Sequence, residues 1–187
     1  MTLFEWYVAR ASGIVAFVLL TIAVLIGLTL SGRAKLPGWP RFAVEDVHRF
    51  AGLLTGTFVS IHVLTLLADS YLPFSPAQLV VPGASTYRPV ATALGVVAAE
   101  LLLALAITNR YRKKLSYRFW RRAHSLNFAV WGLGLLHGIF AGTDRGAAWA
   151  DVLYGCSAAA VAGLLAWRAA GGLQPPAAAS PSSARAG

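Results

Sequence analysis

Residues 43–68, AVEDVHRFAGLLTGTFVSIHVLTLLA, and residues 119–140, FWRRAHSLNFAVWGLGLLHGIF, decide the fold of this chain. Each is an apolar stretch of about the length that a helix needs to cross a lipid bilayer. Each also holds two histidines, and these are only one residue closer together in the second stretch than in the first. The four histidines of the whole chain are His48, His62, His124 and His137. Because a histidine is costly to place within a bilayer, these four positions indicate a functional site.

The composition of the whole chain is that of a membrane protein. Of its 187 residues, 57% are hydrophobic and 12% are charged, and the mean hydropathy is +0.63. The net charge is +9, but the basic residues are concentrated between apolar stretches, so we interpret them as topology signals and expect no nucleic-acid partner. A single cysteine, Cys156, excludes an internal disulfide and a cysteine-ligated metal site. The abundance of arginine and alanine is typical of a GC-rich bacterial genome, and we therefore expect a multi-pass protein of a bacterial plasma (inner) membrane.

Five membrane-spanning helices are predicted, which makes the expected fold an all-α integral membrane bundle. The predicted spans are residues 11–30, 43–68, 89–108, 119–140 and 149–167. Lysine and arginine concentrate after the first and third spans, and the positive-inside rule places these loops in the cytoplasm. The N-terminus is then outside and the C-terminus inside. We expect residues 1–170 to form one membrane domain that carries the four histidines, and residues 171–187, GGLQPPAAASPSSARAG, to be a disordered tail.

This orientation pairs the histidines by depth. The second and fourth spans run in the same direction, so His48 and His124 lie near the inner face while His62 and His137 lie near the outer face. At about 1.5 Å per residue, the two histidines of one span are roughly 20 Å apart. Since neutral imidazole is a common metal ligand, two haem irons can be held one above the other, each by one histidine from each span. Histidines that only hydrogen-bond between helices are the alternative.

Glycines accompany the histidines in both spans. Gly52 and Gly56 follow His48 on nearly the same helical face, where a missing side chain favours either a flat macrocycle or a close helix contact. In the other span the shorter spacing of the histidines does not return to the same face of a straight helix. We expect a bend near Gly132 and Gly134 to bring its two histidines into line.

Charged residues near the histidines are further candidates. Haem carboxylates need cationic partners, and Arg49, Arg121 and Arg122 are placed for this at the inner side, unless they only set the topology. Further candidates at the outer side are Arg10, Arg88 and Tyr87.

Glu100 is the one carboxylate deep in a span, so we expect it to be protonated or partnered. It serves proton movement linked to a quinone, or it hydrogen-bonds a neighbouring helix.

The chain resembles the ferric reductase-like transmembrane domain. The likeness covers about residues 6–167 and rests on HRFAG at 48–52, His62, RFWRRAH at 118–124 and LHG at 136–138. That family includes the membrane parts of NADPH oxidases and ferric reductases, and the haem-binding membrane subunit of the bacterial methionine sulfoxide reductase system. The resemblance implies two b-type haems with two histidine ligands each, which pass electrons across the membrane.

The expected function is therefore that of a di-haem membrane cytochrome b, either an electron conduit or the membrane subunit of an oxidoreductase. No segment is suited to a nucleotide-binding domain, so we expect a quinol or a separate flavoprotein as donor, an extracytoplasmic acceptor, and FMN or a quinone as a further cofactor. One alternative is a ferric or other metal reductase that acts alone. Another is a histidine-lined transporter of a metal ion or of haem, although the spans are too apolar for the polar path of a transporter.

Overall fold

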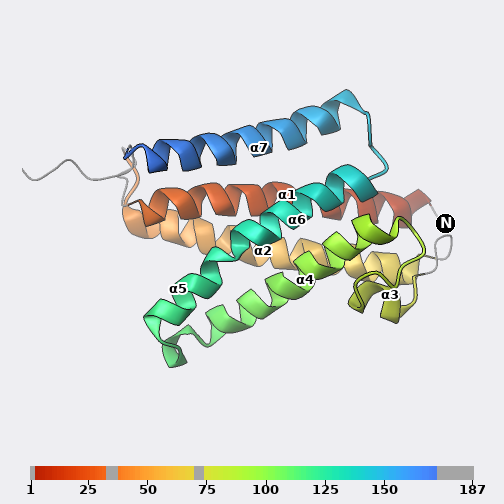
Figure 1. Ribbon diagram of the computed structural model, residues 1–187, viewed down its shortest axis with the longest axis horizontal. Helices are drawn as coiled ribbons and strands as arrows, with labels where there is room; N and C mark the ends of the chain where they lie inside the picture. The colour runs from red at the N-terminus through yellow and green to blue at the C-terminus, as the bar shows by residue number, and fades with distance from the viewer. Residues whose placement is uncertain (1–2, 33–37, 70–73, 172–187) are drawn as a thin grey trace, which may run out of the picture.

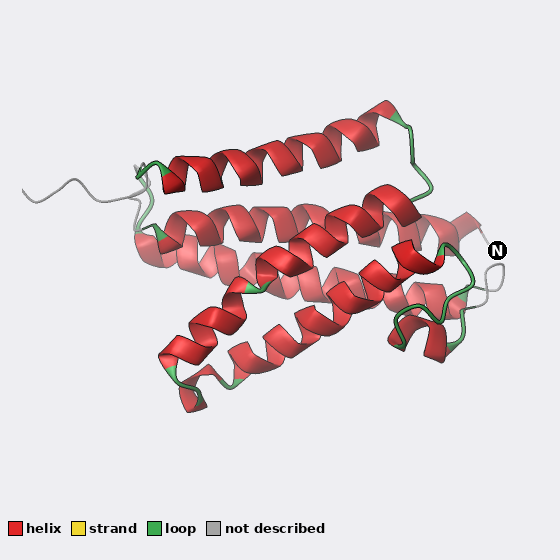
Figure 2. Cartoon of the chain, in the orientation of Figure 1, coloured by secondary structure: helices red, strands yellow, loops and turns green. Residues whose placement is uncertain are grey.

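The structure is a computed structural model that describes residues 3–32, 38–69 and 74–171; these ranges contain helices and loops and no strand (Figure 2). Its α-helices are α1 (Leu3–Ser31), α2 (Arg41–Ala68), α3 (Pro76–Val80), α4 (Pro89–Arg110), α5 (Tyr117–Ser125), α6 (Asn127–Ala141) and α7 (Ala148–Ala169), with a 3₁₀ turn η1 (Arg112–Lys114) before α5. The predicted all-α class is confirmed. The tail predicted to be disordered lies outside the described residues, apart from Gly171.

Four helices in the described part of the chain are long and apolar enough to cross a membrane, namely α1, α2, α4 and α7. The helices α2, α4 and α7 agree with the predicted second, third and fifth spans to within two residues at each end. The first helix begins at Leu3, well before the predicted start at residue 11. It continues through Glu5 and Arg10, and Arg10 pairs with Asp144 of the segment between α6 and α7.

The predicted fourth span is divided into α5 and α6. Leu126 lies between the two helices with φ −65° and ψ −9°, and α6, at 15 residues, is too short to cross a bilayer by itself. The Asn127 amide donates a hydrogen bond to the His124 carbonyl oxygen at 2.8 Å, the kind of side-chain bond that competes with helix geometry. The bend expected near Gly132 and Gly134 is therefore wrong in its position, because α6 runs through both glycines without a break.

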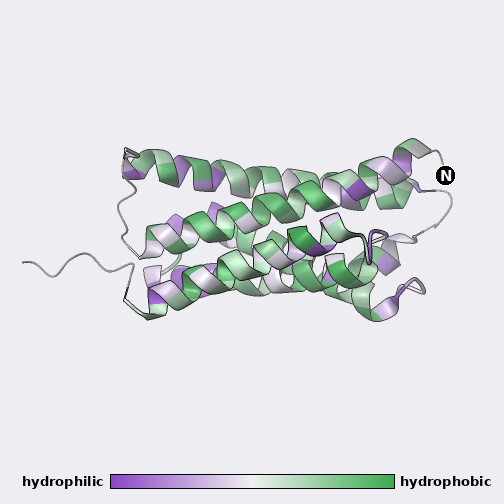
Figure 3. Cartoon of the chain, turned by 90° about the horizontal axis from the view of Figure 1, so that it is seen from above, coloured by the Kyte–Doolittle hydropathy of each residue, from purple (hydrophilic) through white to green (hydrophobic). Residues whose placement is uncertain are grey.

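The chain passes back and forth along the long axis of the molecule (Figure 1). The helices α1 and α2 form one antiparallel hairpin, α4 and α5–α6 form a second, and α7 returns beside α1. The C-terminal ends of α1, α4 and α7 lie at one end of the molecule, and those of α2 and α6 lie at the other. Hydrophobic residues predominate along the helices, and hydrophilic residues gather toward the two ends (Figure 3). This is the arrangement that a membrane-spanning bundle requires.

The helix α1 is the shared packing partner of α2, α6 and α7. It packs extensively on α2 and also contacts α6 and α7, whereas α2 makes only sparse contact with α4. The main buried cluster consists of Leu20, Val24, Leu28, Ala98, Leu105, Val130 and Val161. Trp131 of α6 adds a polar link by donating its Nε1–H to Thr21 Oγ1 of α1 at 3.0 Å. The two hairpins are thus joined mainly through α1, and α2 faces the second hairpin with little direct contact.

Candidate functional site

The four histidines form two pairs, one toward each end of the molecule. The ring centres of His48 and His124 are 6.0 Å apart, and those of His62 and His137 are 6.3 Å apart. These are the pairs that matching by depth predicts. In both pairs α2 supplies one ring, while α5 supplies the second ring of the first pair and α6 that of the other. The division of the predicted fourth span therefore places its two histidines on two different helices.

The separation of the rings fits a metal ion between them. Two imidazoles that bind one metal ion from opposite sides, through bonds of about 2 Å, have ring centres about 6 Å apart. The planes of the paired rings are inclined by 72° in one pair and 78° in the other, so the rings are not stacked on each other. Within the described ranges no three histidine, cysteine, aspartate or glutamate side chains gather into a metal site. The described geometry therefore offers two protein ligands per site, the number that an iron already held in a macrocycle needs.

Three of the rings are held by backbone carbonyl groups of a neighbouring helix. His48 Nδ1 lies 3.0 Å from the Ala23 oxygen, His62 Nδ1 lies 2.7 Å from the Ala9 oxygen, and His137 Nδ1 lies 2.8 Å from the Ala91 oxygen. A carbonyl oxygen only accepts, so the proton of each neutral ring is on Nδ1. The lone pair is then on Nε2, which is the arrangement of a histidine whose second nitrogen binds a metal.

Each of these three rings also rests on a glycine. A Cβ atom built on Gly27 would lie 3.2 Å from the His48 ring, and one on Gly13 would lie 3.1 Å from the His62 ring. The closest case is Gly95, where a Cβ would lie 2.6 Å from the His137 ring. A side chain at any of these positions would push the ring away from its carbonyl partner, most strongly at Gly95.

The carbonyl and the glycine belong to one repeated pattern, Ala-x-x-x-Gly, which the sequence interpretation missed. It occurs at residues 9–13, 23–27 and 91–95, and in each case the alanine carbonyl holds the ring that rests on the glycine. We call these three segments the histidine seats. The two seats on α1 have the same spacing along the chain as His48 and His62 on the antiparallel α2. This equal spacing is visible in the sequence and could have revealed the two seats on α1.

His124 has a different environment. Its ring stacks on Trp120 with ring centres 5.2 Å apart and planes inclined by 20°. Its Nδ1 lies 3.4 Å from Asn127 Nδ2, and the same amide nitrogen lies 2.8 Å from the His124 carbonyl oxygen. Since that oxygen can only accept, the nitrogen end of the Asn127 amide is the end that faces the ring. Local residues of α5 and α6 thus hold His124, in place of a seat on another helix.

Open space adjoins the histidines on α2. A Cβ atom built on Gly52 or Gly56 would meet no described atom within 4 Å. These glycines follow His48 by one and two helical turns, so the open strip continues its face of α2. The two glycines therefore make no close helix contact among the described residues. A flat macrocycle, in contrast, needs open space of this kind beside the histidines. The residues present therefore fit a haem.

The predicted cationic partners are already engaged or exposed. Arg49 contacts Asp46 and Glu45 on its own helix, Arg121 donates to the Tyr117 hydroxyl at 2.9 Å, and Arg122 is exposed. At the other end of the molecule each candidate has a partner as well. Arg10 pairs with Asp144, Arg88 donates to the Phe140 and Gly142 carbonyls, and the Tyr87 hydroxyl reaches the Ala141 carbonyl.

Glu100 is not brought to the histidines. It lies at the middle of α4, about midway between Pro89 and Arg110, and it is exposed on the surface of the chain. It is five residues from Gly95, so it points roughly 140° around the helix from the seat of His137. Neither role expected for Glu100 is therefore connected with the paired rings.

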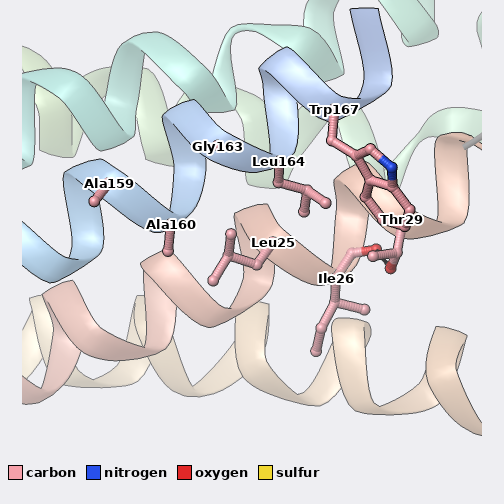
Figure 4. A pocket seen from close by; sticks show the side chains of 8 residues that line it. All are labelled: Leu25, Ile26, Thr29, Ala159, Ala160, Gly163, Leu164 and Trp167. Atoms are coloured by element: carbon pink, nitrogen blue, oxygen red, sulfur yellow. Dashed lines mark hydrogen bonds between the residues drawn. The ribbon is translucent and has the colours of Figure 1, made fainter. Parts of the chain in front are cut away.

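A groove within the described part of the chain lies away from the histidines. It has a volume of about 480 Å³ and runs between α1 and α7, with Leu25 and Ile26 on one side and Ala160 and Leu164 on the other (Figure 4). Its lining is mostly apolar, with Thr29 and Trp167 as the residues that carry a polar side-chain atom, and it contains no histidine. The groove holds no ionisable or metal-ligating side chain, so the histidine pairs are the candidate site.

The sequence also matches a known family. The ferric reductase-like transmembrane component family matches residues 12–135, about two thirds of the chain, and the chain belongs to this family. The matched region includes His48, His62 and His124 and ends two residues before His137. Domains of this family typically bind haem, and the assignment makes the chain a multi-pass membrane component of electron transfer. No solved structure matches it.

Proposed function

We propose that the chain is a di-haem membrane cytochrome b, with one haem held by His48 and His124 and a second held by His62 and His137. The observation that carries this proposal is the pair of ring separations, 6.0 Å and 6.3 Å, at two depths of one helical bundle. The Nδ1 contacts of three of the rings support it, because they leave Nε2 available to a metal. The open strip at Gly52 and Gly56 supports a macrocycle rather than a bare ion.

The proposed topology has five membrane crossings. The helices α1, α2, α4 and α7 each cross once, and α5 and α6 together make the remaining crossing. The end of the molecule that carries η1 and α5 is rich in lysine and arginine, which favours a cytoplasmic location for it. The N-terminus is then outside, the His48–His124 site lies toward the cytoplasm, and the His62–His137 site lies toward the outer face.

The haem would supply an iron that accepts and gives up one electron at a time. The residues of the chain do the rest. The two imidazoles of each site would hold the iron from the protein and leave it no open position, which would favour electron transfer over chemistry at the metal. The seats fix the ring orientations, and the apolar helices keep the site in a low-dielectric environment. Along α2 the two sites are separated by about 21 Å of helix rise, which brings them toward opposite faces of the membrane.

The proposed donor is a quinol or a separate flavoprotein, and the proposed acceptor lies outside the cytoplasm. We keep the proton or quinone role of Glu100 as a proposal that is independent of the histidine site, because its side chain lies on another face of α4. A ferric or other metal reductase that acts alone is the second candidate, and the family assignment is the observation that favours it.

Purification and stopped-flow absorbance test the proposal. The purified chain should be red, should contain close to two haem b per chain, and should show the absorbance of six-coordinate haem. NADPH, a quinol and reduced flavin are then offered in turn, and NADPH alone should reduce neither haem. A colourless protein after expression with ample haem, or one that contains zinc or copper instead, would contradict the di-haem proposal. Rapid oxidation of the reduced protein by ferric chelates would favour the second candidate.

A further inference from the structure

The environment of His124 contains a polar group that the described chain leaves without a partner. The Trp120 indole Nε1–H is shielded from solvent and has no hydrogen-bond acceptor among the described residues. Trp120 is the residue that stacks on His124, and it lies one helical turn closer to the start of α5. An indole nitrogen is a donor only, and a buried donor without an acceptor is unfavourable. An acceptor from outside the chain is therefore indicated at this position.

A second tryptophan shows what a satisfied indole looks like in this molecule. Trp131 lies further along the chain, on α6, and its Nε1–H donates to Thr21 Oγ1 at 3.0 Å. Trp131 belongs to the contact between α6 and α1 and does not stack on a histidine. The unsatisfied donor is thus a specific property of Trp120 at the His124 site.

The charges around Trp120 indicate an anionic acceptor. The helix α5 has the sequence YRFWRRAHS, in which three arginines and no acidic residue accompany the tryptophan. Arg121 is engaged with the Tyr117 hydroxyl, and Arg49 of α2 is engaged with Asp46 and Glu45. A carboxylate beside His124 would find a fixed neutral donor in Trp120 within a positively charged region. The two carboxylate side chains of a haem are groups of this class.

We propose that Trp120 donates its Nε1–H to a carboxylate of the haem bound at His48 and His124, and that its stacked ring sets the orientation of His124. This inference rests on the proposed function. It makes Trp120 a haem-binding residue through its nitrogen and a positioning residue for His124 through its ring. The two sites then differ in kind, because the seats hold both histidines of the outer site and Trp120 takes the place of one seat in the inner site.

The test uses Trp120→Phe, which keeps an aromatic ring for stacking and removes the donor, in the full chain with both haems. A hydrogen bond to a haem carboxylate disperses its negative charge, so its loss stabilises the oxidised iron. The midpoint potential of the inner haem should shift downward while that of the outer haem stays constant. Trp120→Leu, which removes donor and ring together, should also broaden the electron paramagnetic resonance signal of the inner haem and weaken haem retention there. Trp131→Phe is the matched control and should change neither potential.

The His137→Ala variant, which should contain the inner haem alone, assigns the signals to one site. Reconstitution with haem whose carboxylates are esterified provides a second measurement. With this haem, the inner potentials of wild-type chain and Trp120→Phe should differ less than with the free carboxylates, because an ester oxygen still accepts a hydrogen bond but carries no negative charge to disperse.

An unchanged inner potential in Trp120→Phe would overturn the proposal, and so would a shift that is undiminished with the esterified haem or that occurs in the outer haem. Wild-type protein without haem would overturn the proposed function itself. That outcome is distinguishable, because it appears before any variant is compared.

Discussion

At the scale of single residues, the site depends on the positions of two nitrogen atoms in each ring. In three of the four histidines Nδ1 is committed to a carbonyl oxygen, which leaves Nε2 available to a metal. The ring itself is fixed because it rests on a glycine. The sequence predicts the histidines and their pairing, because the alternation of basic loops fixes the direction of each span. It does not reveal the seats directly, since a carbonyl group is present at every residue and only the register between helices selects one.

Removal of single histidines tests the pairing at this scale. We expect His48→Ala and His124→Ala each to reduce the content from two haems per chain to one, with loss of the same haem. His62→Ala and His137→Ala should each remove the other haem. Haem quantitation and redox titration of the four variants are the measurements. If His48→Ala and His62→Ala instead removed the same haem, the pairing would be wrong.

The seat of His137 gives a second prediction at the residue scale. Gly95→Ala places a Cβ where the His137 ring now lies, at 2.6 Å, so we expect weaker binding or loss of the outer haem with the inner haem retained. Gly132→Ala in α6 is the control, because a Cβ there meets no described atom within 4 Å. The control should bind two haems and gain about 0.5–1 kcal/mol of helix stability. An unchanged outer haem spectrum in Gly95→Ala would show that the seat does not constrain the ring.

At the scale of helices, the hydrophobicity of the sequence predicts the bounds of most spans. It does not predict the position of a break that accompanies local hydrogen bonding. The spans α2, α4 and α7 are predicted closely, because each is a continuous apolar stretch between polar or Pro-rich segments. The interruption at Leu126 is instead expected at Gly132 and Gly134, because glycines are the usual signal of a weak point in a helix. In the structure those glycines lie within a regular helix, and the Asn127 amide bonded to the His124 carbonyl accompanies the break.

The extended start of α1 gives a prediction at the helix scale. Arg10 pairs with Asp144 of the segment between α6 and α7, and its guanidinium also lies 4.9 Å from the Trp6 ring centre. We expect Arg10→Gln and Asp144→Asn to destabilise the bundle, with a coupling energy of about 1 kcal/mol in a double-mutant cycle. Chemical denaturation of the wild-type, single-mutant and double-mutant proteins in detergent micelles measures the coupling energy.

The exposed pair of Arg41 and Glu45, one helical turn apart on α2, serves as the control for this cycle. Its coupling should be no more than about 0.5 kcal/mol, because solvent screens exposed charges. Equal coupling in the two cycles would mean that the contact with Asp144 does not fasten α1.

At the scale of the whole molecule, orientation would decide which of the two proposed haems receives electrons first. In a Cys156→Ser background, Lys113→Cys should react with a membrane-impermeant maleimide only after the cells are permeabilised. Arg145→Cys should react in intact cells, because the segment between α6 and α7 is expected outside. These positions lie at opposite ends of the molecule and in exposed segments, so each serves as the control of the other. The reverse pattern of labelling would exchange the inner and outer assignments of the two sites.

The placement of two seats on α1 has a consequence for biogenesis. The ribosome delivers α1 and α2 first, and these two helices alone contain the contacts of His48 with Ala23 and of His62 with Ala9. Neither site has its second histidine until the segment of residues 117–141 has been synthesised, and that one segment supplies both. Synthesis therefore completes the two sites almost together, because only a short stretch of chain separates His124 from His137. In the proposed di-haem protein, the order of translation would therefore favour the assembly of neither haem over the other.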